Sequence, residues 1–237
     1  MNIYLGFDKN FSKKLIMGAS IATEYYHSSN WSRWNVYPTL NITYLPKKGH
    51  VFQLGISSDR NYPNYWTMTN FVTYTNGGYN EITGNPKLRP MKDYRLQLVY
   101  VLNSKYQFVA WLNHADDYFT QSPYQRHDHL TISYQYRNFD FRQQIGTQAV
   151  LPFKAGNWLD TRLTLIGVWQ REKASSFHDI SFDRNIIFGM AGINSTITLS
   201  DRPDIAISLD GMIRSKGIQT IYDLPTSGNI DVRARWQ

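Results

Sequence analysis

The chain has 237 residues, no cysteine and a formal net charge of +7 at pH 7. The lack of cysteine excludes disulfides, thiolate nucleophiles and cysteine-ligated zinc. No run of about 18 apolar residues is present, which argues against a transmembrane helix, and the scattered Lys and Arg residues do not form the tract expected of a nucleic-acid-binding protein.

The aromatic content points to a different class of protein. Aromatic residues make up 15% of the chain, with 17 Tyr and 7 Trp, yet the mean hydropathy is −0.46. Tyr and Trp favour positions where one end of the ring is apolar and the other is wet, as at a bilayer interface. A membrane-spanning barrel alternates lipid-facing and lumen-facing residues, so its mean hydropathy stays polar.

Segments with a period of two recur along the chain, at residues 15–22, 94–102, 205–210 and 230–236. Successive side chains of a strand point to opposite faces, so each of these segments has one apolar and one polar face. No comparable stretch shows a convincing 3.6-residue period. The sequence therefore predicts an all-β protein.

The links between these segments alternate in length. Short links rich in Gly, Pro, Asn and Ser are expected at residues 10–13, 46–49, 103–105, 154–157 and 200–203. Longer links are expected near residues 27–34, 59–90, 120–128, 174–184 and 215–228. Strict alternation of tight turns and long loops is typical of an antiparallel up-and-down transmembrane β-barrel.

Counting the segments between links gives roughly eleven strands, and no change of composition divides residues 1–237 into more than one domain. Single-chain bacterial barrels usually have an even number of strands. Met1 also leads into the first strand without the basic region or cleavage site of a signal peptide. We therefore expect a fragment of a larger barrel, or a truncated reading frame.

Two motifs carry a resemblance to a known family. Residues 59–66 lead through a long loop to Gly-Asn-Pro-Lys-Leu-Arg-Pro at residues 84–90 and then to a Tyr-rich strand at 94–100. Residues 217–224 read Gly-Ile-Gln-Thr-Ile-Tyr-Asp-Leu. Both resemble the C-terminal barrel of TonB-dependent receptors, and most closely the outer-membrane β-barrel family common in Bacteroidetes. The resemblance spans nearly the whole chain.

The resemblance implies nutrient uptake across the bacterial outer membrane, without a cofactor and without enzymatic chemistry in the barrel. It implies outer-membrane lipid as surroundings, and a plug domain and the TonB complex as partners in a full-length parent. This chain departs from the family in carrying neither plug nor TonB box. The family's upstream Arg-Pro is also spread here into Arg60-Asn61-Tyr62-Pro63.

The Gly-Asn-Pro-Lys-Leu-Arg-Pro motif has a structural explanation. Pro86 and Pro90 fix their own φ angles and push the preceding residues into extended geometry. Gly84 permits a turn that other residues cannot make. We expect the motif to return a long loop to strand register, rather than to contact a ligand.

Aromatic residues in the loop at 59–90 are candidate ligand contacts, because loops on rigid scaffolds often carry binding. The candidates are Tyr62, Tyr65, Trp66, Tyr74 and Tyr79. A small molecule, a glycan or a peptide could stack on such rings. The alternative is that the rings pack the loop against its neighbours or belong to the interfacial girdle.

Charged residues on the polar phase of the strands are expected to line a lumen or contact a plug. They are Arg95, Arg162, Asp210, Arg233 and Arg235. On the lipid face a charge near the midplane would cost about 2–4 kcal/mol.

Catalytic and metal sites are not expected. His127-Asp128-His129 places two imidazoles on one face of a strand, but no third ligand is nearby in the sequence. Asp116 and Asp117 are adjacent and would point to opposite faces of a strand. The sequence contains no Gly-x-Ser-x-Gly, phosphate loop or His-Glu-x-x-His motif.

Two other functions stay open. A receptor-like barrel could have lost transport and serve in adhesion or export. Alternatively, a soluble β-sandwich could bind glycans through its loop aromatics, and it would then stay in solution without detergent.

Overall fold

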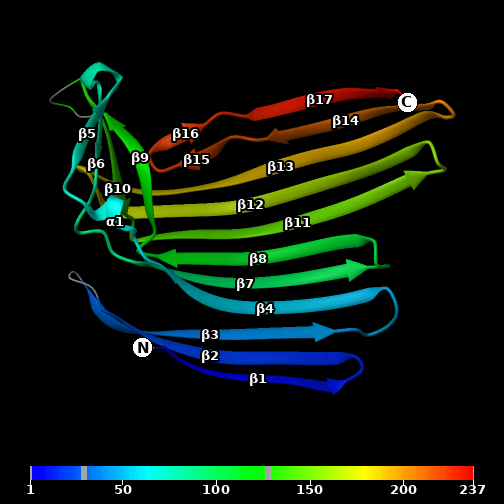
Figure 1. Cartoon of the computed structure of the whole chain (residues 1–237), viewed down its shortest axis with the longest axis horizontal. Coiled ribbons are helices and arrows are strands. Elements are labelled where there is room, and N and C mark those ends of the chain that lie inside the picture. The colour runs from blue at the N-terminus through cyan, green and yellow to red at the C-terminus, as the bar shows by residue number, and fades with distance from the viewer. Residues whose placement is uncertain (1, 28–30, 126, 128–129, 237) are drawn as a thin grey trace.

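The computed structural model describes residues 2–27, 31–125, 127 and 130–236. One antiparallel sheet of eleven strands dominates it, in the order β1-β2-β3-β4-β7-β8-β11-β12-β13-β14-β17 (Figure 1). The strands are β1 (Asn2–Ser12), β2 (Leu15–His27), β3 (Ser32–Tyr44), β4 (His50–Asn61), β7 (Met91–Leu102), β8 (Tyr106–Asp116), β11 (Phe141–Ala155), β12 (Leu159–Phe177), β13 (Ile180–Asp201), β14 (Asp204–Arg214) and β17 (Ser227–Trp236). Because β1 and β17 stand at the two ends of this order, the described strands form an open, partial barrel.

The strands meet in tight turns at one end of the sheet and in longer links at the other (Figure 1). All the short links expected from the sequence lie at the first end, which we call the turn end. Two long links are wrong. β2 ends at His27 and β3 begins at Ser32, so the link expected near 27–34 has only four residues. Residues 174–184 belong to β12 and β13, which run on to a tight turn at His178 and Asp179. The charged residues in this stretch are typical of a loop in composition, although the side chains continue the alternation of the two strands.

The long links of the other end, the loop end, carry their own structure. β5 (Val72–Thr75), β6 (Asn80–Thr83), β10 (Ile132–Asn138) and β9 (Phe119–Gln125) form a second sheet, the loop sheet, in which β6 and β10 are parallel. The remaining elements are α1 (Tyr65–Met68), η1 (Asn76–Gly78), β15 (Gly217–Gln219) and β16 (Tyr222–Leu224). Two loops far apart in sequence are thus joined by strand pairing.

A small hydrophobic core lies where the loop sheet meets the extended ends of β12 and β13. Tyr124, Phe139, Ala174 and Phe177 are its buried members. Because this core involves both loops and strands, it holds the loop sheet against the loop end of the barrel wall. Among the described residues, no helix combines the length and apolar character needed to cross a bilayer.

The strand register gives the main sheet two faces of different chemistry. One row of directly opposed residues, from β4 to β12, consists of Ile56, Leu96, Leu112, Ile145 and Trp169. The next row consists of Ser57, Arg95, Asn113, Gln144 and Gln170. We call these the apolar and the polar face, because side-chain direction alternates along every strand.

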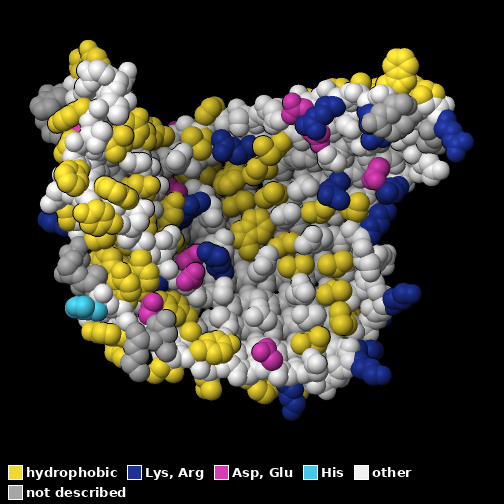
Figure 2. Space-filling view, viewed as in Figure 1, with side chains coloured by type: hydrophobic (Ala, Val, Ile, Leu, Met, Phe, Trp, Pro, Cys, Tyr) yellow, Lys and Arg dark blue, Asp and Glu magenta, His cyan; other side chains and the backbone are white. Residues whose placement is uncertain are grey.

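The apolar face is uncovered in the structure. Leu96 is 40% exposed, Ile145 45% and Ile187 78%. A soluble sandwich would bury such a face against a second sheet, so the sandwich alternative is wrong. Figure 2 shows charged side chains scattered over the face in view, with Lys and Arg side chains along the edge formed by the turn end.

Trp111 and Gly146 form a cross-strand pair on the polar face. A Cβ at Gly146 would lie 2.2 Å from the Trp111 ring, so the indole covers the glycine. By contrast, a Cβ at Gly167 on the apolar face would have Thr147 Oγ1 as its nearest neighbour, at 3.8 Å.

We predict that Gly146→Ala lowers the stability of the assembled protein by about 1–3 kcal/mol, because the added methyl group must displace the Trp111 ring. Gly167→Ala is the matched control and should be neutral or slightly stabilising, since alanine is the better strand residue. The measurement is the denaturation midpoint in phospholipid vesicles. Equal midpoints for the two variants would show that the ring does not pack on Gly146.

Candidate functional site

A cleft of about 670 Å³ opens at the loop end, between the ends of β2 to β4 and the segment 86–90. Its lining includes Tyr26, Trp31, Arg33, Asn35, Arg60, Tyr62, Lys87, Arg89 and Asp117. The register places Tyr26 opposite Arg33 and Glu24 opposite Asn35, all on the polar face. The cleft is therefore built on the polar face.

A hydrogen-bonded cluster forms the base of the cleft. Tyr37 and Tyr62 each donate to Glu24 Oε2, both at 2.6 Å, and Asn35 Nδ2 donates to the Tyr62 hydroxyl at 2.8 Å. Burial, followed by the hydrogen bond to the Glu24 carboxylate, raises the pKa of Tyr62 far above its usual range. Tyr62 therefore stays protonated and acts as a fixed donor.

Three aromatic rings stack above this cluster. The ring centroids of Tyr26 and Tyr62 are 4.1 Å apart in a stacked arrangement, and Trp31 lies 5.7 Å from Tyr26. Trp31 Nε1 also donates to the Leu88 carbonyl at 3.3 Å, which links the two walls of the cleft. A planar ligand could extend such a stack.

The opposite wall is the Gly-Asn-Pro-Lys-Leu-Arg-Pro motif, and it is firmly anchored. Asn85 Nδ2 donates to the Tyr136 carbonyl at 2.9 Å, and Asn85 Oδ1 accepts from Lys87 N at 3.0 Å. Leu88 is fully buried. These contacts support the structural explanation of the motif, although Lys87 and Arg89 also line the cleft.

Gly84 is required for a reason that differs from the expected one. It is not among the glycines with positive φ, so no unusual turn depends on it. A Cβ at Gly84 would instead lie 2.1 Å from the Thr69 carbonyl oxygen. The glycine allows two backbone segments of the loop to approach each other closely.

Positive charge surrounds the mouth of the cleft. Arg33, Arg60, Lys87 and Arg89 line it, and Asp117 is the acidic residue among the lining residues. Arg89 pairs with Asp117 at 2.7 Å and is itself 58% exposed. The arrangement combines stacked rings with an excess of cations, which suits an anionic ligand that carries a flat group.

The five candidate loop aromatics do not form one site. Tyr62 lies in the cleft, whereas Tyr65 and Trp66 are on α1, in edge contact with ring centroids 5.4 Å apart, and are 71% and 74% exposed. Tyr74 and Tyr79 project from the loop sheet region and are 64% and 60% exposed. The four exposed rings are available for binding, but none of them lines the cleft.

Sequence reasoning did not find Tyr26, Trp31, Arg33 or Arg89. Tyr26 and Arg33 come together through the pairing of β2 and β3, and Tyr26 meets Tyr62 through packing across 36 residues of chain. Of these four residues, only Arg89 could have been singled out from the sequence, because it belongs to the Gly-Asn-Pro-Lys-Leu-Arg-Pro motif.

The charged residues expected on one phase do share the polar face. Arg95 is in the polar row. Arg162 lies directly opposite Asn194 on the next strand, and Asn194 lies directly opposite Asp210. Arg233 and Arg235 pair with Ser208 and Ala206 on the same face. A hollow of about 630 Å³ near Arg95, Trp111 and Gln144 continues the polar face below the cleft.

The segment that carries β15 and β16 folds back over the polar face. Glu172 is buried there and accepts from Thr220 N at 2.9 Å, while Gln170 Nε2 donates to it at 3.0 Å. Its strand neighbours Arg171 and Lys173 are charged although they lie on the apolar face. This part of β12 is therefore outside the hydrocarbon. Burial is the largest influence on Glu172 and raises the pKa of its carboxyl.

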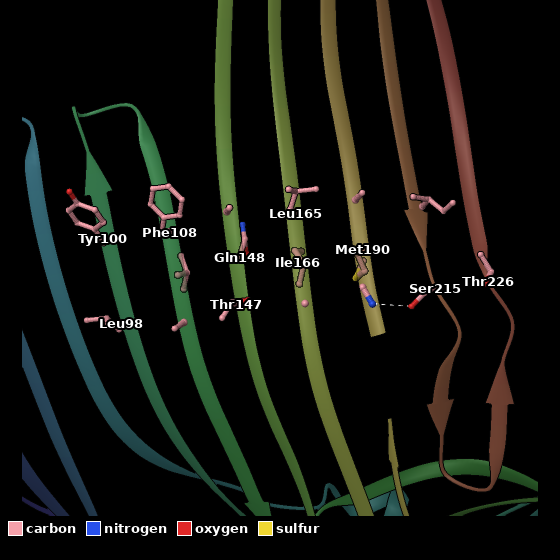
Figure 3. A pocket seen from close by; sticks show the side chains of 17 residues that line it. Leu98, Tyr100, Phe108, Thr147, Gln148, Leu165, Ile166, Met190, Ser215 and Thr226 are labelled. Atoms are coloured by element: carbon pink, nitrogen blue, oxygen red, sulfur yellow. Dashed lines mark hydrogen bonds between the residues drawn. The ribbon is translucent and has the colours of Figure 1, made fainter. Parts of the chain in front are cut away.

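A hollow of about 840 Å³ lies on the apolar face (Figure 3). Leu98, Tyr100 and Phe108 flank it on one side, and small residues such as Thr147, Gly167 and Gly189 form its floor. Gly189 N donates to Ser215 Oγ at 2.9 Å at its edge. Because it opens on the face that meets hydrocarbon, we assign it to lipid contact rather than to a solute.

No cluster of three metal-ligating side chains occurs within the described part of the chain. Of the sequence His127-Asp128-His129, the last two residues lie outside the described residues, and His127 Nε2 is 3.5 Å from Asp179. Asp117 lies just beyond the end of β8, has a positive φ and pairs with Arg89, so it does not act together with Asp116.

Comparisons with known proteins agree with this architecture. The model of a family described as "Outer membrane protein beta-barrel family" matches residues 13–237. No curated protein matches the sequence.

Several solved structures similar to the chain are receptors. The siderophore receptor PirA from Acinetobacter baumannii has a TM-score of 0.60 and 11% identity over 99% of this chain and 39% of its own. PirA from Pseudomonas aeruginosa has a TM-score of 0.55 and 13% identity over 90% of this chain and 44% of its own. The ferric enterobactin receptor PfeA from Pseudomonas aeruginosa has a TM-score of 0.50 and 12% identity over 99% of this chain and 45% of its own. These likenesses show the fold, and the chain spans less than half of each receptor.

We predict that Tyr62→Phe loosens the cleft without unfolding the wall. The variant keeps the stacked ring but loses the hydrogen bonds to Glu24 and Asn35, and leaving buried polar groups unpaired costs about 1–3 kcal/mol locally. The measurement is amide hydrogen exchange at residues 84–90, which should become faster.

Tyr65→Phe is the control, since Tyr65 is 71% exposed and outside the cluster. It should leave the exchange unchanged. If Tyr62→Phe exchanged no faster than this control, the hydrogen-bonded cluster would not support the stacked rings through which Trp31 holds Leu88.

Proposed function

The chain belongs to the outer membrane protein beta-barrel family, and on this premise we propose that it forms part of the wall of a receptor for nutrient uptake. Its location is the bacterial outer membrane, and its fold resembles siderophore-receptor barrels. Barrels of this kind place tight turns in the periplasm and long loops outside the cell. The loop end, with the cleft, is then the extracellular end.

The observation that carries the proposal is the position of the cleft. It lies on the polar face at the loop end, above the hollow lined by Arg95, Trp111 and Gln144. A solute captured there would already be on the lumen side of the wall. Eleven strands are also half of the twenty-two found in plugged outer-membrane transporters.

The substrate class follows from the lining of the cleft. Stacked rings and an excess of cations favour a small anionic molecule with planar groups, and an iron-chelating siderophore is the first candidate. The names of the similar receptors point in the same direction. The exposed rings of Tyr65, Trp66, Tyr74 and Tyr79 would make first contact with a small molecule, a glycan or a peptide at the cell surface.

The partners follow from the polar face. Arg95, Arg162, Asp210, Arg233 and Arg235 would face the lumen and contact a polar plug domain supplied by the full-length protein. A TonB complex would then act on that plug. The wall itself performs no chemistry in this proposal, and the residues that it contributes serve binding and passage.

The test compares a bacterium that carries this gene with its deletion strain, using a panel of labelled siderophores that begins with ⁵⁵Fe-loaded enterobactin. The intact strain should accumulate at least one panel member. The double variant Arg33→Gln with Lys87→Gln should weaken its binding to the cells on the order of tenfold, because two charge-assisted contacts are lost.

Lys92→Gln with Lys173→Gln is the matched control, since it removes the same charge at the same end from two residues that do not line the cleft. It should bind normally. Equal accumulation by the intact and deletion strains would contradict uptake, and binding at the cell surface without accumulation would support an adhesion or export barrel instead.

A further inference from the structure

Three neighbouring turns at the turn end are joined into one continuous edge. Leu45 N, in the β3–β4 turn, donates to the Lys14 carbonyl of the β1–β2 turn at 2.7 Å. Ser104 N, in the β7–β8 turn, donates to the Gly49 carbonyl at 2.9 Å. Gly49 has a φ of +83°, and a Cβ there would lie 3.2 Å from Asn103 Cα, so glycine permits the close approach. The edge is therefore fixed by its backbone.

This edge, which we call the basic edge, carries five exposed lysines. They are Lys13, Lys14, Lys47, Lys48 and Lys105. The turns themselves, residues 13–14, 45–49 and 103–105, contain no acidic residue. The β11–β12 turn differs, because Lys154 next to it forms an ion pair with Asp160 at 2.9 Å. The turns under β1 to β8 thus carry their positive charge without an acidic residue of their own.

Aromatic rings lie beside the basic edge on the apolar face. Tyr44, Phe52, Tyr100 and Phe108 form a ladder across β3, β4, β7 and β8, with neighbouring ring centroids 6.4, 4.4 and 6.2 Å apart. Lys105 Nζ lies 5.1 Å from the Tyr106 ring centroid. Aromatic girdles mark the boundary between hydrocarbon and headgroups in outer-membrane barrels. The ladder therefore places the lysines at the depth of lipid headgroups.

We propose that the basic edge binds the phosphate groups of anionic phospholipids in the periplasmic leaflet of the outer membrane. Lysine side chains near a bilayer boundary extend towards the headgroups while their methylenes stay on apolar surface. Five cations spread over the width of six strands, roughly 25 Å, match a charged lipid surface rather than one small anion. A single lysine near an anionic surface shifts lipid binding by about fivefold.

The test uses the absence of native cysteine. The assembled protein carries a fluorophore on Ser104→Cys, in the basic edge, or on Asn157→Cys, in the β11–β12 turn at the same end. Each is reconstituted in vesicles that contain brominated phosphatidylglycerol or brominated phosphatidylcholine. Bromine quenches the fluorophore on contact, so the ratio of the two quenching constants reports the local lipid composition.

Phosphatidylglycerol should quench the Ser104→Cys label several-fold more strongly than phosphatidylcholine does, and both should quench the Asn157→Cys label alike. The preference should disappear when all five lysines are changed to Gln, and it should survive their change to Arg. In the unsubstituted edge, 1 M salt should also abolish it, because screening then acts within about 3 Å.

Equal quenching by the two lipids at Ser104→Cys would overturn the proposal, and so would a preference that persists in the Gln variant. If the Gln variant failed to assemble, a preference that withstood 1 M salt would overturn it equally. Equal quenching by the two lipids would instead favour an acidic periplasmic protein as the partner of the edge.

Discussion

The structure depends on the need to pair every backbone N–H and C=O inside hydrocarbon, where no water can replace a missing partner. A continuous antiparallel ladder of eleven strands meets this need between its edges. Once the ladder forms, the register is fixed, and all side chains of one row share a face. Row after row, apolar side chains such as Leu96 and Ile145 then meet lipid, while Arg95 and Gln144 lie on the other side.

The two ends of the sheet differ because water is available beyond the hydrocarbon. At the turn end the chain reverses as tightly as possible, and hydrogen bonds between turns join them into an edge. At the loop end β12 and β13 continue past the belt, and loops fold back over the polar face through Glu172 and the core around Phe139 and Phe177. The cleft is a product of this folding back, since one wall is strand and the other is loop.

The sequence was sufficient for the wall, because period-two alternation is a local signal. It predicted the number of main strands, the tight turns and the shared face of Arg95, Arg162, Asp210, Arg233 and Arg235. It was insufficient for the loop end. The parallel pairing of β6 with β10 and the contact of Tyr26 with Tyr62 join distant segments, and no local pattern encodes them. Composition also misled, since the charged stretch 174–184 is a hairpin, and Gly84 is required for close approach rather than for a turn.

The two-faced wall is tested most directly by the accessibility of single cysteines in the assembled protein in lipid. Cysteines at Leu96, Ile207 and Val232 should contact a lipid-soluble quencher and resist a water-soluble thiol reagent. Cysteines at the adjacent positions Arg95, Ser208 and Arg233 should behave in the opposite way. If the two sets exchanged their behaviour, or if both were shielded from lipid, the wall as described here would be wrong.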